Sequence, residues 1–287
     1  MDAAADRNVL TVDVENHTPD QSELYVPGTG RWHGAGSTKV ELVDDYEIGA
    51  QVLRPDGSVF VEGATGYTAV YSGASGKWAA GPNFPIDGSQ LDVADGPAAL
   101  LPDGNVLCVA SPGIYNAGAH FFEFNGTKLI PEPGVPNSPS DSSYNFRMLV
   151  LPNGQILQTD GTNDVEIYTH GGHAQASWAP TISKVASSLT RGTTYQLSGV
   201  HLNGFSQGAA YGDDAQAATN YPLVRITNAA TGHVFYARTH DFSSMAVASP
   251  ATVSTSFDVP ATMETGKSSL VVTTNGIPSA PTAVTVK

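Results

Sequence analysis

The chain has 287 residues and a formal net charge of −14, with 13 Lys and Arg against 27 Asp and Glu. This acidity disfavours nucleic acid and anionic membrane surfaces as partners. The sequence contains no run of eighteen apolar residues, so we expect no membrane span. A single cysteine excludes an internal disulfide and a cysteine-rich metal site. The 30 Gly, 19 Pro and 14% charged residues are typical of an all-β protein with many turns.

One short phrase is repeated along the chain, at residues 53–60, 101–107 and 151–157. Each copy has an apolar run, a turn that contains Gly, and a second apolar run, which is the pattern of a β-hairpin. The turn glycines recur every 47 to 50 residues. A strand-rich repeat of this length predicts propeller blades rather than a helical solenoid.

A fourth copy of the phrase lies at the beginning of the chain. Residues 8–12 match the second half of the hairpin, and Asp6 and Arg7 stand where the later copies have their turn. The pattern lacks the strand that precedes this turn. We therefore expect about four blades, of which the first is incomplete.

A further strand with aromatic residues follows the hairpin in the first two copies. Residues 24–32 and 70–78 each have a Tyr seven positions before a Trp, with a turn of small residues between them. Large side chains bury the most area between neighbouring blades, so we interpret Trp32 and Trp78 as packing residues. Stacking on a ligand is the alternative.

The hairpin phrase and the strand that ends in Trp resemble kelch-type β-propellers, specifically the galactose-oxidase-like group. The resemblance covers residues 7–180 and implies blades arranged around a common axis. A fold of this kind says little about function. Because four blades do not close a typical ring of this group, we expect the rest to come from another chain, from a symmetric copy, or from a missing N-terminal segment.

The repeat disappears after residue 180, and residues 181–287 contain short β-branched runs separated by turns. This pattern predicts an immunoglobulin-like β-sandwich of about a hundred residues. The stretches 211–214, 220–225 and 275–279 resemble the C-terminal domain that follows the propeller in galactose oxidase and glyoxal oxidase.

The resemblance also bears on localisation, because known relatives are mostly exported. Residues 1–6 lack the basic and apolar regions of a signal peptide. We expect a secreted protein, extracellular or periplasmic, whose leader is absent from this chain. A cytoplasmic location is the alternative.

A copper-radical oxidase site is implied by the resemblance, since the group ligates copper with a Tyr-His pair ahead of the last hairpin. The matching positions are Tyr144 and Asn145. The Tyr is kept, but an amide is a poor copper ligand beside imidazole. A further histidine ligand would come from the C-terminal domain, where His233 and His240 are both candidates.

Other groups could carry chemistry, and each has a plainer structural interpretation. Residues 204–208 read G-x-S-x-G but are followed by loop residues rather than by the helix that a nucleophile elbow needs. The remaining groups are Asp44-Asp45 and Asp213-Asp214 for calcium, His170 and His173 for a metal, and His240-Asp241 as an acid–base pair. We interpret these as surface turns and structural histidines, and Cys108 as a small buried residue.

A binding face is expected in the long connections between strands, since propellers bind ligands at the central channel or in loops between blades. The aromatic residues that could stack on a sugar there are Tyr115, Tyr144 and Phe146.

The sequence thus favours a non-enzymatic exported protein that binds or scaffolds, with a glycan or cell-surface ligand and no cofactor. The alternative is a copper-dependent oxidoreductase of the galactose oxidase or glyoxal oxidase kind, acting on a carbohydrate or alcohol. In that case the absent N-terminal part would supply the missing site residues.

Overall fold

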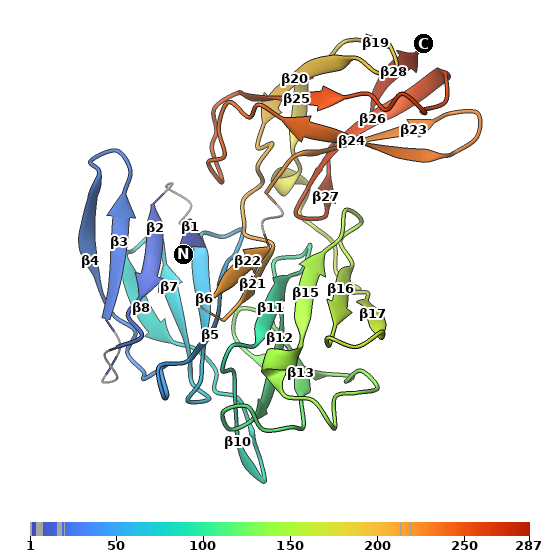
Figure 1. The fold of residues 1–287 in the computed structure, drawn as a ribbon. Coiled ribbons are helices and arrows are strands. Elements are labelled where there is room, and N and C mark those ends of the chain that lie inside the picture. The colour runs from blue at the N-terminus through green and yellow to red at the C-terminus, as the bar shows by residue number, and fades with distance from the viewer. Residues whose placement is uncertain (1, 4–7, 16–18, 20, 213, 218–219) are drawn as a thin grey trace.

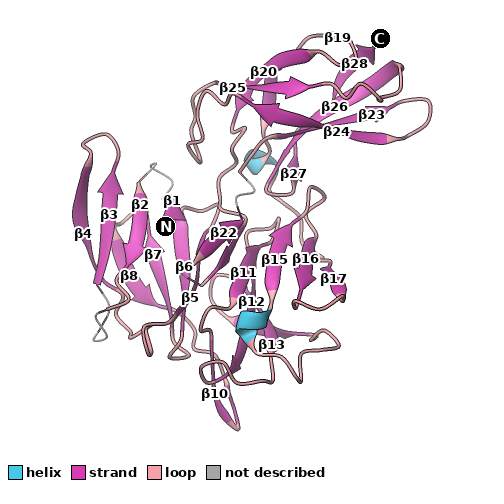
Figure 2. Cartoon of the chain, in the orientation of Figure 1, coloured by secondary structure: helices cyan, strands magenta, loops and turns pink. Residues whose placement is uncertain are grey.

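The computed structural model describes residues 2–3, 8–15, 19, 21–212, 214–217 and 220–287. It consists of strands and loops with two short 3-10 turns, η1 (Ser143–Asn145) and η2 (Ala176–Trp178) (Figure 2). The expected all-β fold is confirmed. Neither helical turn of the described residues has the length and apolar character that a membrane crossing requires.

The first two sheets are called blade 1 and blade 2, and in each the consecutive strands pair antiparallel. Blade 1 contains β1 (Asp2–Ala3), β2 (Val9–Val12), β3 (Gln21–Val26) and β4 (Arg31–Ser37). Blade 2 contains β5 (Ile48–Leu53), β6 (Ser58–Gly63), β7 (Thr68–Ser72) and β8 (Lys77–Ala80). The expectation that the first blade lacks the strand before its turn is wrong, because β1 pairs with β2 in that place, although β1 has only two residues. The expected turn residues Asp6 and Arg7 lie outside the described residues.

The next two sheets are blade 3 and blade 4, which lie to the right of the first two in Figure 1. Blade 3 contains β11 (Pro97–Leu100), β12 (Val106–Pro112), β13 (His120–Phe124) and β14 (Leu129–Glu132), and β12 also pairs with the small hairpin of β9 (Ile86–Asp87) and β10 (Ser89–Asp92). Blade 4 contains β15 (Arg147–Val150), β16 (Ile156–Thr159) and β17 (Val165–Tyr168).

The repeated phrase forms the hairpin between the first two strands of blades 2, 3 and 4. The turn residues Gly57, Gly104 and Gly154 have φ of 79°, 88° and 83°, in the left-handed region that glycine adopts without a steric penalty. The backbone N–H groups of Gly104 and Gly154 each donate to a carbonyl three residues earlier, at 2.9 Å. These turns fix the register that repeats from blade to blade.

Each pair of neighbouring blades shares a buried apolar layer, because side chains alternate between the two faces of a strand. Leu10 of blade 1 lies in one cluster with Val59 and Trp78 of blade 2. Phe60 of blade 2 stacks on Phe124 of blade 3, with ring centroids 3.8 Å apart. Similar clusters join blade 3 to blade 4, so the four sheets form an arc of a propeller.

The C-terminal sandwich has its own core and two layers. Its strands are β18 (Thr181–Lys184), β19 (Ser188–Leu189), β20 (Thr194–Val200), β23 (Leu223–Asn228), β24 (Val234–His240), β25 (Val253–Asp258), β26 (Gly266–Thr274), β27 (Ile277–Pro278) and β28 (Thr282–Val286). The strand β24 belongs to both layers, because its first half pairs with β23 and its second half with β25.

One hairpin leaves the sandwich and joins the propeller. The strand β21 (Ala209–Tyr211) pairs with β22 (Ala215–Ala217) and also with β11 of blade 3 (Figure 1). Next to it, the backbone N–H of Gln207 donates to the carbonyl of Leu53 in blade 2. The hairpin therefore covers the inner edge of the arc and ties the sandwich to blades 2 and 3.

A buried carboxyl group lies in the layer between blades 2 and 3. Glu62 on β6 is fully buried, and its oxygens make no hydrogen bond of normal geometry with the described residues. Burial raises the pKa of Glu62 from 4.5 to about 8, and the neighbouring thiol of Cys108 opposes this only weakly. Cys108 is itself buried, in agreement with its interpretation from sequence.

We predict that Glu62→Gln removes a pH dependence of stability. The pKa of Glu62 is higher in the folded state than in the unfolded state. The contribution of Glu62 to the free energy of unfolding is therefore fully present below pH 4.5 and is lost as the pH rises to about 8. At pH 7 the variant should therefore exceed the parent in free energy of unfolding by roughly 3 kcal/mol, with little difference at pH 4. Urea unfolding at both pH values measures this, and an equal difference at both would contradict it.

Candidate functional site

Six side chains from five segments converge at one end of the arc, and we call this group the mouth. Glu47 precedes β5, Asp95 lies between β10 and β11, and Tyr115 lies in the loop between β12 and β13. The other members are Tyr144 in η1, Arg147 at the start of β15, and Tyr211 at the end of β21. The hairpin from the sandwich therefore contributes Tyr211 to the mouth, and the blades and their loops contribute the other five residues.

Two tyrosine rings form the exposed part of the mouth. Tyr115 and Tyr144 meet edge to face with centroids 5.0 Å apart, and they are 42% and 38% exposed. The Tyr115 hydroxyl donates to Asp95 Oδ2 at 3.4 Å. Partial burial, together with the carboxylates of Glu47 and Asp95, raises the pKa of Tyr115, so its hydroxyl stays protonated near neutral pH.

Tyr211 and Arg147 fix the inner side of the mouth. The Arg147 guanidinium lies over the Tyr211 ring, 3.7 Å from its centroid, and donates to the carbonyls of Tyr144 and Phe146 at 2.7 Å each. The Tyr211 hydroxyl donates to the carbonyl of Tyr144 at 3.0 Å. These contacts hold the backbone at Tyr144 in place and leave its ring exposed.

The backbone is strained in this region. Asp95 and Tyr115 have φ of 51° and 62°, in the left-handed region that side chains with a Cβ rarely adopt. Each such residue costs about 1–3 kcal/mol, and such strain clusters at binding sites. Gly212, after β21, has φ of 45°, and a Cβ there would clash with Asp95.

The structure brings together only part of the predicted sugar-stacking set. Tyr115 and Tyr144 lie at the mouth, but the expectation that Phe146 is exposed is wrong. Phe146 is fully buried between blades 3 and 4, where its ring meets Phe121 edge on at 5.4 Å. It alternates with Arg147 along the strand, so its ring points into the blade interface.

The copper candidates do not form a cluster among the described residues. Asn145 uses its amide oxygen to accept the backbone N–H of Ser142, which caps η1. His233 Nδ1 lies 2.7 Å from Glu264 Oε1. His240 Nδ1 lies 2.8 Å from Asp241 Oδ2, and His240 Nε2 lies 3.1 Å from Asp258 Oδ1. The pKa of His240 is raised, chiefly by Asp258 and then by Asp241. Both histidines thus pair with carboxylates at the surface of the sandwich, and the residues present do not fit a copper site.

The remaining motifs have structural roles where they are described. Ser206 is buried, and the strand β21 rather than a helix follows it, so the G-x-S-x-G stretch forms no nucleophile elbow. Asp44 is bridged to Glu47 through its backbone. Burial and the charge of Asp44 raise the pKa of the neighbouring Asp92 to about 7. Asp213 lies outside the described residues.

A charged cluster that the sequence did not reveal joins blades 3 and 4. His170 lies with Nε2 at 2.7 Å from Asp103 and Nδ1 at 2.9 Å from Glu123. It forms the only group of three potential metal ligands in the part of the chain described. The two carboxylates approach opposite ring nitrogens, so the imidazole of His170 bridges them. We call this group the histidine clamp, and His173, expected to act with His170, is not a member.

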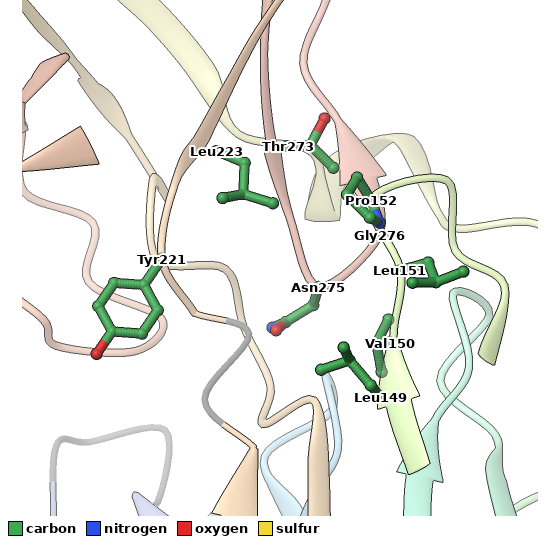
Figure 3. A pocket seen from close by; sticks show the side chains of 9 residues that line it. All are labelled: Leu149, Val150, Leu151, Pro152, Tyr221, Leu223, Thr273, Asn275 and Gly276. Carbon is green, nitrogen blue, oxygen red and sulfur yellow. The ribbon is translucent and has the colours of Figure 1, made fainter. Parts of the chain in front are cut away.

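Two hollows lie where the blades meet the sandwich. One has a volume of about 280 Å³ and is lined mainly by apolar residues of β15 and the following turn, by Tyr221 and by Asn275 (Figure 3). The other, of about 320 Å³, is bordered by His170, His173 and the turn of blade 4. Neither includes a residue of the mouth.

Comparison with known proteins does not assign the chain to a family. No family model and no curated protein matches it. Domains 4 and 5 of the S-layer protein SbsC are 12% identical with a TM-score of 0.18, over 70% of this chain and 95% of that chain. The GH74 enzyme of Niastella koreensis is 12% identical with a TM-score of 0.25, over 96% of this chain and 49% of that chain. Likenesses this weak carry no argument.

We predict that His170→Asn destabilises the protein through the histidine clamp. The His170 side chain is only 14% exposed, and its loss leaves Asp103 and Glu123 with Asn105 as their only common partner among the described residues, which should cost about 2 kcal/mol. His233→Asn is the matched control, because His233 also pairs with a carboxylate but is 67% exposed, so it should cause little loss. Urea unfolding compares the two, and equal effects would contradict the role of the clamp.

Proposed function

We propose that this chain is a non-enzymatic exported binding protein in which the blades act as a scaffold and the mouth binds a sugar unit. The observation that carries the proposal is the pair of half-exposed rings of Tyr115 and Tyr144, held edge to face beside Asp95. Such rings offer an apolar face to the C–H groups of a sugar, and nearby polar groups bond its hydroxyls.

The geometry of the mouth supports binding of a neutral ligand. Glu47 and Asp95 can accept hydrogen bonds from sugar hydroxyls, whereas Arg147 is already engaged with Tyr211 and two carbonyls. The described members of the mouth carry two carboxylates against one guanidinium, so their net charge is negative, which disfavours an anionic ligand.

The chain is proposed to be part of a larger propeller of the kelch type, in keeping with its resemblance to the galactose-oxidase-like group. The rest of the ring would come from another chain or from sequence outside these 287 residues. Members of that group are mostly exported, which supports a secreted, extracellular or periplasmic location.

The alternative function is a copper-radical oxidase, and Tyr144 at the mouth is the observation that favours it. Asn145 argues against it, because its amide caps η1 instead of turning toward the mouth. His233 and His240 argue against it as well, because each is held by a carboxylate of the sandwich.

We predict saccharide binding that depends on both tyrosines. An array of immobilised mono- and oligosaccharides identifies the best-binding sugar, and calorimetry with that free sugar measures its affinity. Tyr115→Ala and Tyr144→Ala should each weaken binding about tenfold, as expected for the loss of about 1.4 kcal/mol. Tyr236→Ala is the control, since Tyr236 is equally exposed but lies on β24 of the sandwich. Absence of binding on the array, or equal loss in the control, would sink the proposal.

The copper alternative is tested on the same protein. Titration with Cu²⁺ should reveal no tight stoichiometric site that is lost in Tyr144→Phe, and no hydrogen peroxide should form from galactose or glyoxal. A stoichiometric copper site that requires Tyr144 and supports peroxide formation would replace the proposed function with the oxidase.

A further inference from the structure

The face of blade 1 that points away from blade 2 is exposed, and we call it a bare face. The equivalent face of blade 2 is buried against blade 1. Trp32 and Trp78 occupy equivalent positions, since they pair with Tyr25 and Tyr71 in the same register, at ring separations of 5.2 and 5.3 Å. Trp78 is 6% exposed and donates from Nε1 to Ser22 Oγ of blade 1 at 2.8 Å. Trp32 is 46% exposed.

The indole N–H of Trp32 faces no acceptor among the described residues, although its twin has one. Val9 and Tyr25 share the face of Trp32 and are only partly covered, whereas their equivalents Val59 and Tyr71 are buried. The aromatic pair therefore has the geometry of a blade interface without the second blade.

Blade 4 is bare on its opposite face. Leu149 and Ile167 are exposed, and they flank Leu157 on one side of the sheet. The equivalents of Leu149 in blades 2 and 3, Val52 and Ala99, are fully buried against the next blade. This end of the arc thus also has an interface without its partner.

In the hairpin turns, the proline of one blade contacts the turn glycine of the following blade, and this contact indicates what would pack against blade 4. Pro55 of blade 2 touches the position of Gly104 in the turn of blade 3, and Pro102 of blade 3 likewise touches Gly154 of blade 4. The next residue in this series is Pro152, which borders the apolar hollow of about 280 Å³ together with Leu149 (Figure 3). The hollow lies where the turn of a following blade would pack.

The geometry points to one kind of occupant for both faces: a further blade of the same repeat, from polypeptide beyond these 287 residues. On blade 1 it presents aliphatic side chains and a hydroxyl that accepts the Trp32 indole N–H. On blade 4 it places its turn glycine against Pro152. This inference deepens the proposed membership of a larger propeller.

A second copy of this chain fits blade 1 less well. The position equivalent to Ser22 in blade 4 is Val165, since Ser22 pairs with Val12 as Val165 pairs with Thr159. Valine has no hydroxyl, so blade 4 of a second copy would bury the indole N–H of Trp32 without this acceptor, which is unfavourable. A blade with the face of blade 1 itself supplies the acceptor.

The first test measures the parent chain. Hydroxyl-radical footprinting, read by mass spectrometry across a wide range of concentration, should modify Trp32 several-fold faster than Trp78. A concentration-dependent dimer in which Trp32 becomes protected would overturn the inference in favour of a second copy.

The second test supplies the missing blade by design. Ala3 and Leu53 occupy equivalent positions, because they pair with Val9 and Val59. Residues 1–51 joined to residues 2–287 therefore reproduce the spacing between blades 1 and 2. With Trp32→Phe in the added copy, the remaining Trp32 should be modified as slowly as Trp78, and Ser22→Ala in the added copy should partly reverse this.

Every other outcome contradicts the inference. A folded added copy that leaves Trp32 reactive shows that the face does not take a blade, and an added copy that stays unprotected in hydrogen exchange shows that the face cannot order one. Sugar binding by the mouth is measured on the same tandem protein. The mouth shares no residue with the exposed face of blade 1 or of blade 4. Loss or retention of sugar binding therefore tests the proposed function separately from the added blade.

Discussion

Each blade is apolar on both faces, and this requirement for two neighbours governs the structure. Alternation along β12 sends Val106 and Cys108 toward blade 2 and Leu107 and Val109 toward blade 4. A sheet of this kind cannot be stable alone in water, since each face contributes about 25 cal/mol for every Å² that it buries. Blades 2 and 3 meet the requirement fully, and blades 1 and 4 meet it on one side.

The inner edge of the arc poses a second problem, because an unpaired edge strand offers its backbone groups to other chains. The hairpin of β21 and β22 pairs with β11 and so covers this edge with residues from the sandwich. The loop after β24 adds to this connection, since Val247 packs in the layer between blades 1 and 2. The sandwich is therefore part of the propeller's core packing as well as a separate layer pair, and it positions Tyr211 at the mouth.

Much of this architecture could be predicted from the sequence, because it depends on local signals. The turn glycines and the alternation around them define the hairpins of blades 2 to 4, and the spacing from Tyr to Trp defines the outer strand pair. Contacts between distant segments could not be predicted. The histidine clamp joins residues that are 67 positions apart, and β21 pairs with a strand of blade 3 that precedes it by more than a hundred residues. The burial of Phe146 could not be predicted either, because the Pro- and Ser-rich residues before it indicate a loop and not the start of an alternating strand.

The side chains exposed at the mouth are determined by the contacts of the hairpin residue Tyr211 and of the segment that begins with η1. A redox metal site needs several imidazole or thiolate ligands facing one point, and here the segment from Tyr144 to Arg147 is committed to other contacts. Asn145 caps the turn, Phe146 enters the core, and Arg147 covers Tyr211. Tyr144 and Arg147 face solvent, and the residue that meets the Tyr144 ring is Tyr115, whose φ is positive, rather than a histidine. The packing that fixes the mouth therefore leaves two phenol rings beside carboxylates at its surface, and the proposed sugar binding rests on this set.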